Sequence, residues 1–119
     1  MTVIDAQVHI WGAENPERPW SPGGAALALA QYPNVAVTAT SLPSYVTEAY
    51  LYPSLHAHIR CVVEAHGPHR VFWGTDLTRL RGSYRQAVTL FTEELDFLSD
   101  IDTTWIMGRG IAEWLGWPL

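Results

Sequence analysis

The chain has 119 residues, of which 48% are hydrophobic and 16% charged, a balance typical of one folded domain and not of a disordered segment. Its formal net charge is -5 and it has no Lys/Arg cluster, which argues against nucleic-acid binding. No apolar run approaches the ~20 residues that span a bilayer, and the first residues lack the pattern of a signal peptide. We therefore expect a cytoplasmic protein that binds neither nucleic acid nor membrane.

Two strands and a loop are predicted in the first third of the chain. Residues 3–9 are short and β-branched, with polar side chains at their end, as in a strand. Residues 12–24 are rich in proline, glycine and charge and predict a loop. A short run of helix formers at residues 25–31 comes next. Residues 34–40 predict a second strand, which is apolar enough at its start to be covered on both faces.

The rest of the chain predicts three helices and one more strand. Residues 54–66 have apolar side chains at helical spacing and are followed by Gly67. Residues 70–76 predict a strand with an apolar body and a polar exit. Ser83 with Gln86 has the form of a capping box at the start of a helix over residues 83–99, whose apolar stripe is Ala87, Leu90, Phe91, Leu95 and Leu98. A last helix from residue 100 is expected to be interrupted at Gly108 and Gly110.

Strands that alternate with helices predict a parallel sheet, and function in such sheets collects at the carboxyl ends of the strands. The first strand ends in Gln7 and His9, and the last in Thr75 and Asp76. If these strands are neighbours, an imidazole and a carboxylate face one crevice, which suits a shared metal or a proton-transfer pair. The alternative is that His9 is a structural histidine and Asp76 caps the turn that follows it.

Other candidates carry weaker signals. Trp11, Arg18 and Trp20 lie in or beside the loop that would cover the crevice, so they are candidates for substrate binding. Cys61 is expected to be a small buried side chain, and as the single cysteine it cannot form an internal disulfide. His66 is expected to be exposed beside the Gly-Pro break, as is His69.

The chain resembles the amidohydrolase-related family, the branch that contains carboxymuconate-semialdehyde-type decarboxylases and pyrone-dicarboxylate lactonases. The resemblance covers nearly the whole chain and is carried, in order, by VIDAQVHIWG, ENPERPW, YPNVAV, RVFWGTDLTRL, YRQAVTLFTEEL and WIMGRGIAEWLGWP. It implies a (β/α)₈ barrel and a metal-dependent hydrolase or a non-oxidative decarboxylase. The three predicted strands resemble the first, seventh and eighth strands of that barrel.

A complete barrel of this type needs ~200 residues or more, so the resemblance implies a partial barrel. We expect one truncated amidohydrolase-type domain over residues 1–119. Within it, residues 1–12 would be the first strand, 13–24 the loop at which the middle strands are missing, and 25–119 the C-terminal barrel portion. The three parallel strands would lie in the order seven, eight, one, with helices packed against them.

The resemblance also implies roles for individual residues. Asp76 matches the aspartate that ends the eighth strand, a metal ligand and proton shuttle, and His9 matches the second histidine of a His-x-His pair. Gln7 stands in place of the first histidine, where it would orient substrate or water. His9 and Asp76 would hold one divalent metal, with zinc as the first expectation, or would act without metal as in some lactonases of the superfamily.

Two functions remain open at this point, beside a third that rests only on the loop with Trp11, Arg18 and Trp20, a metal-independent module that binds a small ligand. The first is a hydrolase or decarboxylase that acts on a small carboxylate, lactone or amide, with water activated by Asp76 and with His9 beside it. The second is an inactive remnant that self-associates or docks with a complementing chain. The missing strands favour the second function, because they would leave sheet edges and an apolar sheet face exposed.

Overall fold

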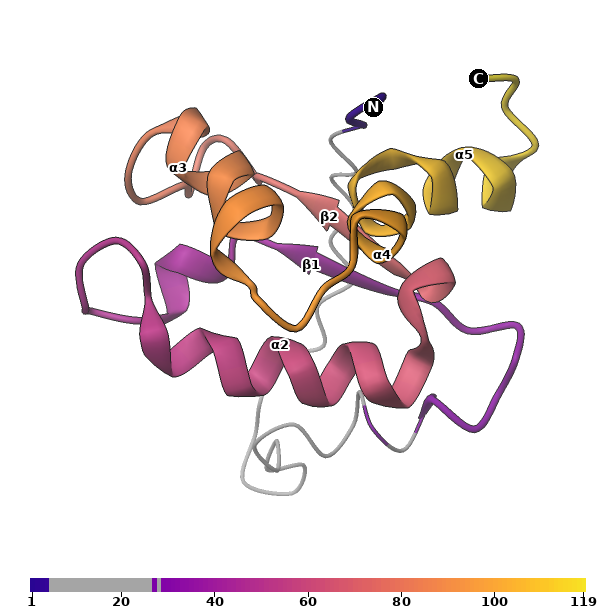
Figure 1. The fold of residues 1–119 in the computed structure, drawn as a ribbon, viewed down its shortest axis with the longest axis horizontal. Helices are drawn as coiled ribbons and strands as arrows, with labels where there is room; N and C mark the ends of the chain where they lie inside the picture. Colours follow the sequence, from indigo (N-terminus) through magenta and orange to yellow (C-terminus); the bar gives the residue numbers. More distant parts are fainter. Residues whose placement is uncertain (5–26, 28) are drawn as a thin grey trace.

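The computed structural model describes residues 1–4, 27 and 29–119. Two parallel strands, β1 (Val37–Thr40) and β2 (Val71–Gly74), lie at the centre and are connected through helix α2 (Pro53–His66). Figure 1 shows α2 below the strands and the later helices above them. The prediction of a mixed α/β fold with parallel strands is thus confirmed. Most of the predicted strand over residues 3–9 falls outside the described residues.

Helix α2 begins and ends where the sequence predicts. Pro53 occupies its first turn, where a missing backbone N–H costs nothing. The carboxylate of Glu48 accepts hydrogen bonds from the backbone N–H and the hydroxyl of Ser54, at 2.8 and 2.6 Å. At the other end Gly67, with a φ of 76°, donates its N–H to the carbonyl of Val63 at 2.8 Å and ends the helix.

The helix predicted over residues 83–99 is present but shorter than predicted. Helix α3 (Tyr84–Thr89) starts at the predicted capping box, in which Ser83 and Gln86 exchange hydrogen bonds of 2.9 and 3.1 Å. It continues as a π-helical turn over Leu90–Glu94 and ends at Leu95. The apolar stripe predicted for this helix is buried at Ala87, Leu90, Phe91 and Leu95.

The predicted interruption of the last helix is confirmed. Helix α4 (Asp100–Thr104) and helix α5 (Gly110–Leu115) are separated by a π-helical turn over Trp105–Arg109. Glycines permit close approach here: a Cβ on Gly108 would lie 2.4 Å from the carbonyl oxygen of Thr2, and one on Gly110 would lie 2.9 Å from that of Trp105. The turn therefore brings the helix against the first residues of the chain.

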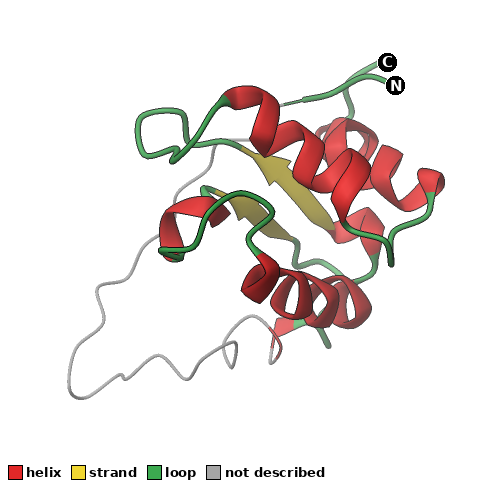
Figure 2. Cartoon of the chain, turned by 60° about the vertical axis from the view of Figure 1, so that its left-hand side comes forward, coloured by secondary structure: helices red, strands yellow, loops and turns green. Residues whose placement is uncertain are grey.

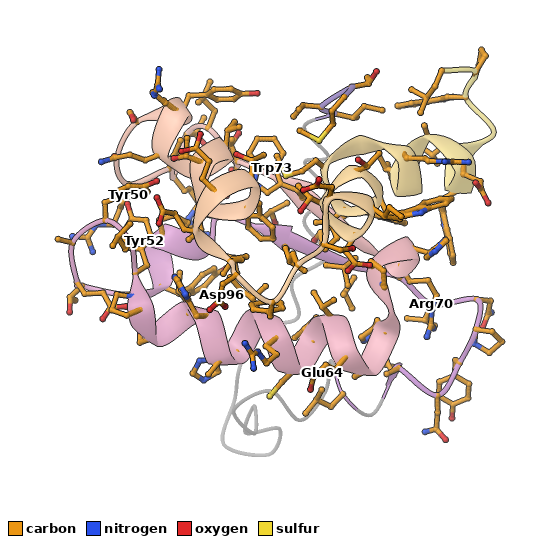
Figure 3. All side chains as sticks on the ribbon, in the orientation of Figure 1. Tyr50, Tyr52, Glu64, Arg70, Trp73 and Asp96 are labelled. Atoms are coloured by element: carbon orange, nitrogen blue, oxygen red, sulfur yellow. The ribbon has the colours of Figure 1, made fainter. Side chains whose placement is uncertain are left out.

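The side chains of the two strands alternate between two apolar clusters. Val71 and Trp73 of β2 face α2, α3 and the π-helical turns, and Figure 3 shows Trp73 among these elements. Phe72 faces the other way and packs with Ile111 of α5. Figure 2 shows the strand pair between α2 and the C-terminal helices. On β1 the prediction of cover on both faces is wrong, because Thr38 is exposed.

Arg70 fixes the segment that leads into β1. Its guanidinium donates to the carbonyls of Tyr32 at 2.7 Å, Val35 at 3.1 Å and Ala30 at 3.1 Å, and its Nε donates to the carbonyl of His66 at 2.9 Å. Figure 3 shows Arg70 pointing toward that segment. Charge-assisted hydrogen bonds of this kind connect the start of β1 to the start of β2.

Two predictions about α2 are wrong for one geometric reason. Leu55, Ile59, Val63 and His66 form the buried stripe of this helix. Cys61 lies off that stripe and is exposed, although it was expected to be buried. His66 lies on the stripe and is 3% exposed, although it was expected to be exposed. His69, outside the helix, is exposed as predicted, and its ring stacks on Trp105 with the centroids 3.7 Å apart.

Candidate active site

Four buried polar residues gather where the two strands end. Thr40 is the last residue of β1 and Ser41 follows it, whereas Thr75 and Asp76 follow β2. The register pairs Thr40 with Gly74, so both strands end at the same edge. All four polar residues are at most 9% exposed. Buried polar side chains are costly unless hydrogen-bonded, so this edge of the sheet is the part of the described structure best suited to chemistry.

Asp76 is the carboxylate at this edge. It is 2% exposed, and its Oδ1 accepts a hydrogen bond from the hydroxyl of Thr78 at 3.3 Å. Its backbone carbonyl accepts from the N–H of Arg79 at 2.8 Å, which closes the turn after β2. Its φ of 48° is left-handed, a conformation that aspartate tolerates better than most residues. The sequence prediction of Asp76 at the carboxyl end of a strand is therefore confirmed in position.

Ser41 continues β1 at the same edge and also has a left-handed backbone, with a φ of 57°. The hydroxyl of Ser44 donates to the carbonyl of Ser41 at 2.6 Å and lies 2.7 Å from the hydroxyl of Ser41. Because the hydroxyl proton of Ser44 points to this carbonyl, the hydroxyl oxygen of Ser44 accepts a hydrogen bond from the hydroxyl of Ser41. The pair holds the short 3-10 helix Leu42–Tyr45 against the end of β1.

Tyr45 and Arg79 add a phenol and a cation to this edge. Partial burial raises the pKa of the Tyr45 hydroxyl above its ordinary value of 10.0. The Arg79 guanidinium acts against that rise in pKa, and the Asp76 carboxylate adds to it. Tyr45 therefore lies within electrostatic reach of both charges, and its hydroxyl stays protonated at neutral pH. Its side chain is 53% exposed, so it can reach a bound molecule.

The sequence singled out Asp76 but missed Ser41, Tyr45 and Arg79. One signal was available: each follows a predicted strand by a few residues, and loops at this edge carry function in parallel sheets. The remaining predicted site residues lie outside the described residues: His9, Gln7, Trp11, Arg18 and Trp20. The predicted pairing of His9 with Asp76 stays a prediction.

A metal site cannot be built from the described residues. They contain no group of three or more His, Cys, Asp or Glu side chains that could hold an ion. Of the two ligands expected from the sequence, only Asp76 lies in the described part, whereas a catalytic zinc ordinarily has three protein ligands. We derive no step of the chemistry through a metal.

The chain was compared with family models, curated proteins and solved structures, and nothing in any of the three matches it. Among the described helices, none has the length and apolar content needed to cross a membrane.

Proposed function

We propose that the chain is a hydrolase, or a non-oxidative decarboxylase, of the amidohydrolase-related type that acts on a small carboxylate, lactone or amide. The observation that carries the proposal is the position of Asp76, a carboxylate 2% exposed just beyond the end of a parallel strand. In parallel α/β proteins the catalytic acids and bases are commonly held at the carboxyl ends of the strands. The reaction class is the one implied by the resemblance noted in the sequence.

Asp76 would act as the general base. Its carboxylate takes a proton from a water molecule while the water oxygen attacks the substrate carbonyl carbon. The tetrahedral intermediate then collapses, the bond from carbonyl carbon to ring oxygen or amide nitrogen breaks, and Asp76 returns the proton to the leaving atom. General acid–base catalysis of this kind contributes roughly 10²–10⁴-fold in rate. His9, if it lies beside Asp76 as the sequence predicts, would share the proton transfer.

Tyr45 and Arg79 would bind the substrate. The protonated phenol can donate a hydrogen bond to the carbonyl oxygen on which negative charge develops. The exposed Arg79 guanidinium can pair with a substrate carboxylate. Gln7, Trp11, Arg18 and Trp20 stay in the proposal as substrate-binding residues on the strength of the sequence alone.

A partial barrel is the proposed architecture around this site. The parallel β1–α2–β2 arrangement fits two consecutive barrel strands with their connecting helix. Ile4 packs with Phe72 of β2, and its N–H donates to the carbonyl of Met107 in the π-helical turn at 2.7 Å, so the first residues of the chain lie beside β2. That contact is at the start of the segment predicted to be the first barrel strand.

A hydrolysis screen tests the proposal. The purified chain is incubated with five- and six-membered lactones, aryl esters and aryl amides, some with and some without a free carboxylate, and the released acid is titrated. We expect hydrolysis above buffer for at least one lactone or amide, with preference for the carboxylated member of a pair. Hydrolysis that is equal in the wild type and in Asp76→Asn would contradict the role of Asp76.

The second candidate function is an inactive remnant that self-associates or docks with a complementing chain. A specific observation favours it: an open groove of about 640 Å³ is lined largely by apolar side chains on the face of Phe72. Trp114 and Leu115 in that groove are 44% and 50% exposed. The two candidates differ in the screen, since the second predicts no hydrolysis by the chain alone.

A further inference from the structure

The exposed side of β1 lies between two apolar hollows. On the α2 side, a cavity of about 140 Å³ is lined by β1 and by Leu55, Ile59 and Val62. On the α5 side, the larger groove is lined by Ala36, Phe72, Ile111 and Trp114. Thr38 lines both hollows. The strand and its two hollows form one continuous surface, which we call the β1 surface.

The outer edge of β1 lies within this surface. Among the described residues, β1 pairs with β2 alone. Thr38, in the middle of the strand, is exposed. Edge strands present unpaired N–H and C=O groups and are templates for pairing with another strand. Because the strand edge is flanked by apolar hollows, a strand that pairs with it would also bury apolar side chains.

The absence of charged side chains among the described residues of the β1 surface indicates which molecule can bind there. None of the described residues that line the two hollows is Asp, Glu, Lys or Arg, whereas the whole chain has a formal net charge of -5. Two copies of an acidic chain repel each other, and because salt screens charges over about 10 Å, the repulsion is smallest where the contact surface carries no charged group. Because no described Asp, Glu, Lys or Arg lines the two hollows, a second copy can approach there. A strongly charged partner would find no complementary group on it.

We infer that two copies of this chain form a two-fold symmetric dimer by pairing their β1 edges in antiparallel orientation. The inference rests on the self-association proposed above and names its surface. The four strands then form one sheet, with both β1 strands in the middle and Thr38 close to the symmetry axis. A Thr–Thr pair across antiparallel strands is a favourable contact. Each copy covers part of the other's two hollows, as an isologous interface requires.

The groove on the α5 side contributes exposed apolar side chains to such a contact. Trp114, at 44% exposure, offers about 100 Å² of a side chain that can bury up to about 250 Å². Leu29 and Leu115 in the same groove are 44% and 50% exposed. These exposed side chains supply part of the roughly 800 Å² per partner that a standard interface buries.

Sedimentation velocity tests the inference on the full chain. The wild type should sediment as a species of twice 13.3 kDa at micromolar concentrations. Thr38→Lys places two like charges near the axis, and Trp114→Lys charges the groove; each should raise the dimer Kd about tenfold or more. Ile101→Lys is the matched control, since Ile101 is 70% exposed and lines neither hollow. Far-UV circular dichroism verifies that each variant is folded.

Disulfide trapping gives a second readout that does not depend on loss of association. In a Cys61→Ser background, Thr38→Cys should form an intermolecular disulfide under mild oxidation, because the inferred pairing brings both positions within bonding range. Ile101→Cys should not form one. A monomeric wild type overturns both the dimer and the self-association. The wild type could also be a dimer whose Kd is unchanged by Thr38→Lys and whose Thr38→Cys variant forms no intermolecular disulfide. That result would overturn the β1 surface as the interface, while self-association would stand.

Discussion

Ser41 and Asp76 lie at the same edge of the strand pair, one after each strand, and both have a left-handed backbone, with φ values of 57° and 48°. For residues with a Cβ this conformation costs roughly 1–2 kcal/mol. Strained backbone is often found at functional sites, where the surrounding structure holds it in place. The shared conformation turns the chain sharply at both exits and leaves a buried carboxylate at the edge.

The strain at Ser41 can be measured with a matched pair of variants. Ser41→Ala and Ser41→Gly both remove the hydroxyl that meets Ser44, but only glycine tolerates a positive φ without cost. Ser41→Gly should therefore have a free energy of unfolding about 1 kcal/mol higher than Ser41→Ala. Urea unfolding followed by tryptophan fluorescence checks this. Equal stabilities would mean that Ser41 is not strained.

The titration of Tyr45 reports on its two charged neighbours. Asp76→Asn should lower the pKa of Tyr45, since the carboxylate opposes phenolate formation, and Arg79→Gln should raise it, since the cation favours phenolate. Ultraviolet difference titration, with Tyr45→Phe subtracted, isolates this phenol from the other four tyrosines. Shifts in the same direction for both substitutions would contradict the arrangement.

A stability measurement tests the same group. Because the folded pKa of Tyr45 is raised above the unfolded value of 10.0, its contribution to stability is complete below pH 10.0 and is lost as the pH rises through the folded pKa. Tyr45→Phe should flatten that part of the decline in unfolding free energy at alkaline pH. If the unfolding free energy of Tyr45→Phe falls with the same slope as that of the wild type, groups other than Tyr45 cause the decline.

Gly108 should be intolerant of any side chain. A Cβ there would lie 2.4 Å from the carbonyl oxygen of Thr2, so Gly108→Ala should force residues 2–4 away from the helix and break the hydrogen bond from Ile4 to Met107. We expect a loss of about 1–3 kcal/mol in unfolding stability and faster amide exchange at Ile4. Gly116→Ala is the control, because nothing lies within 4 Å and only its φ of 68° opposes alanine. Unchanged exchange at Ile4 in Gly108→Ala would contradict the contact.

Removal of divalent metal should leave hydrolysis largely intact. Gln7 stands where the resemblance implies a histidine ligand, and the described residues contain no group of three or more His, Cys, Asp or Glu side chains that could hold an ion. We expect dialysis against a chelator to change kcat/KM less than about twofold, far below the 10²–10⁴-fold contribution expected of the general base. Elemental analysis of the same samples accompanies the assay. Loss of activity that added zinc restores would instead support a site built by His9 and Asp76.

Local signals in the sequence predicted the elements well. The capping box at Ser83 and the proline and glycine at the ends of α2 act through nearest neighbours, so no tertiary knowledge was needed. The polar residues that follow β2, Asp76 among them, were predictable for the same reason. Cys61 and His66 were misassigned because burial depends on which face of α2 meets the strands. The π-helical turns and the left-handed Ser41 depend on tertiary packing, and a pattern of residue types does not encode it directly.

The most direct test of the account is the kcat/KM of Asp76→Asn, measured on the best substrate of the hydrolysis screen. Asp96→Asn is the control, because Asp96 is a surface carboxylate that meets Arg60 at 3.6 Å with its side chain 89% exposed. We expect a loss of roughly 10²–10⁴-fold for Asp76→Asn and wild-type activity for Asp96→Asn, with both variants folded by circular dichroism. Full activity in a folded Asp76→Asn would contradict the account.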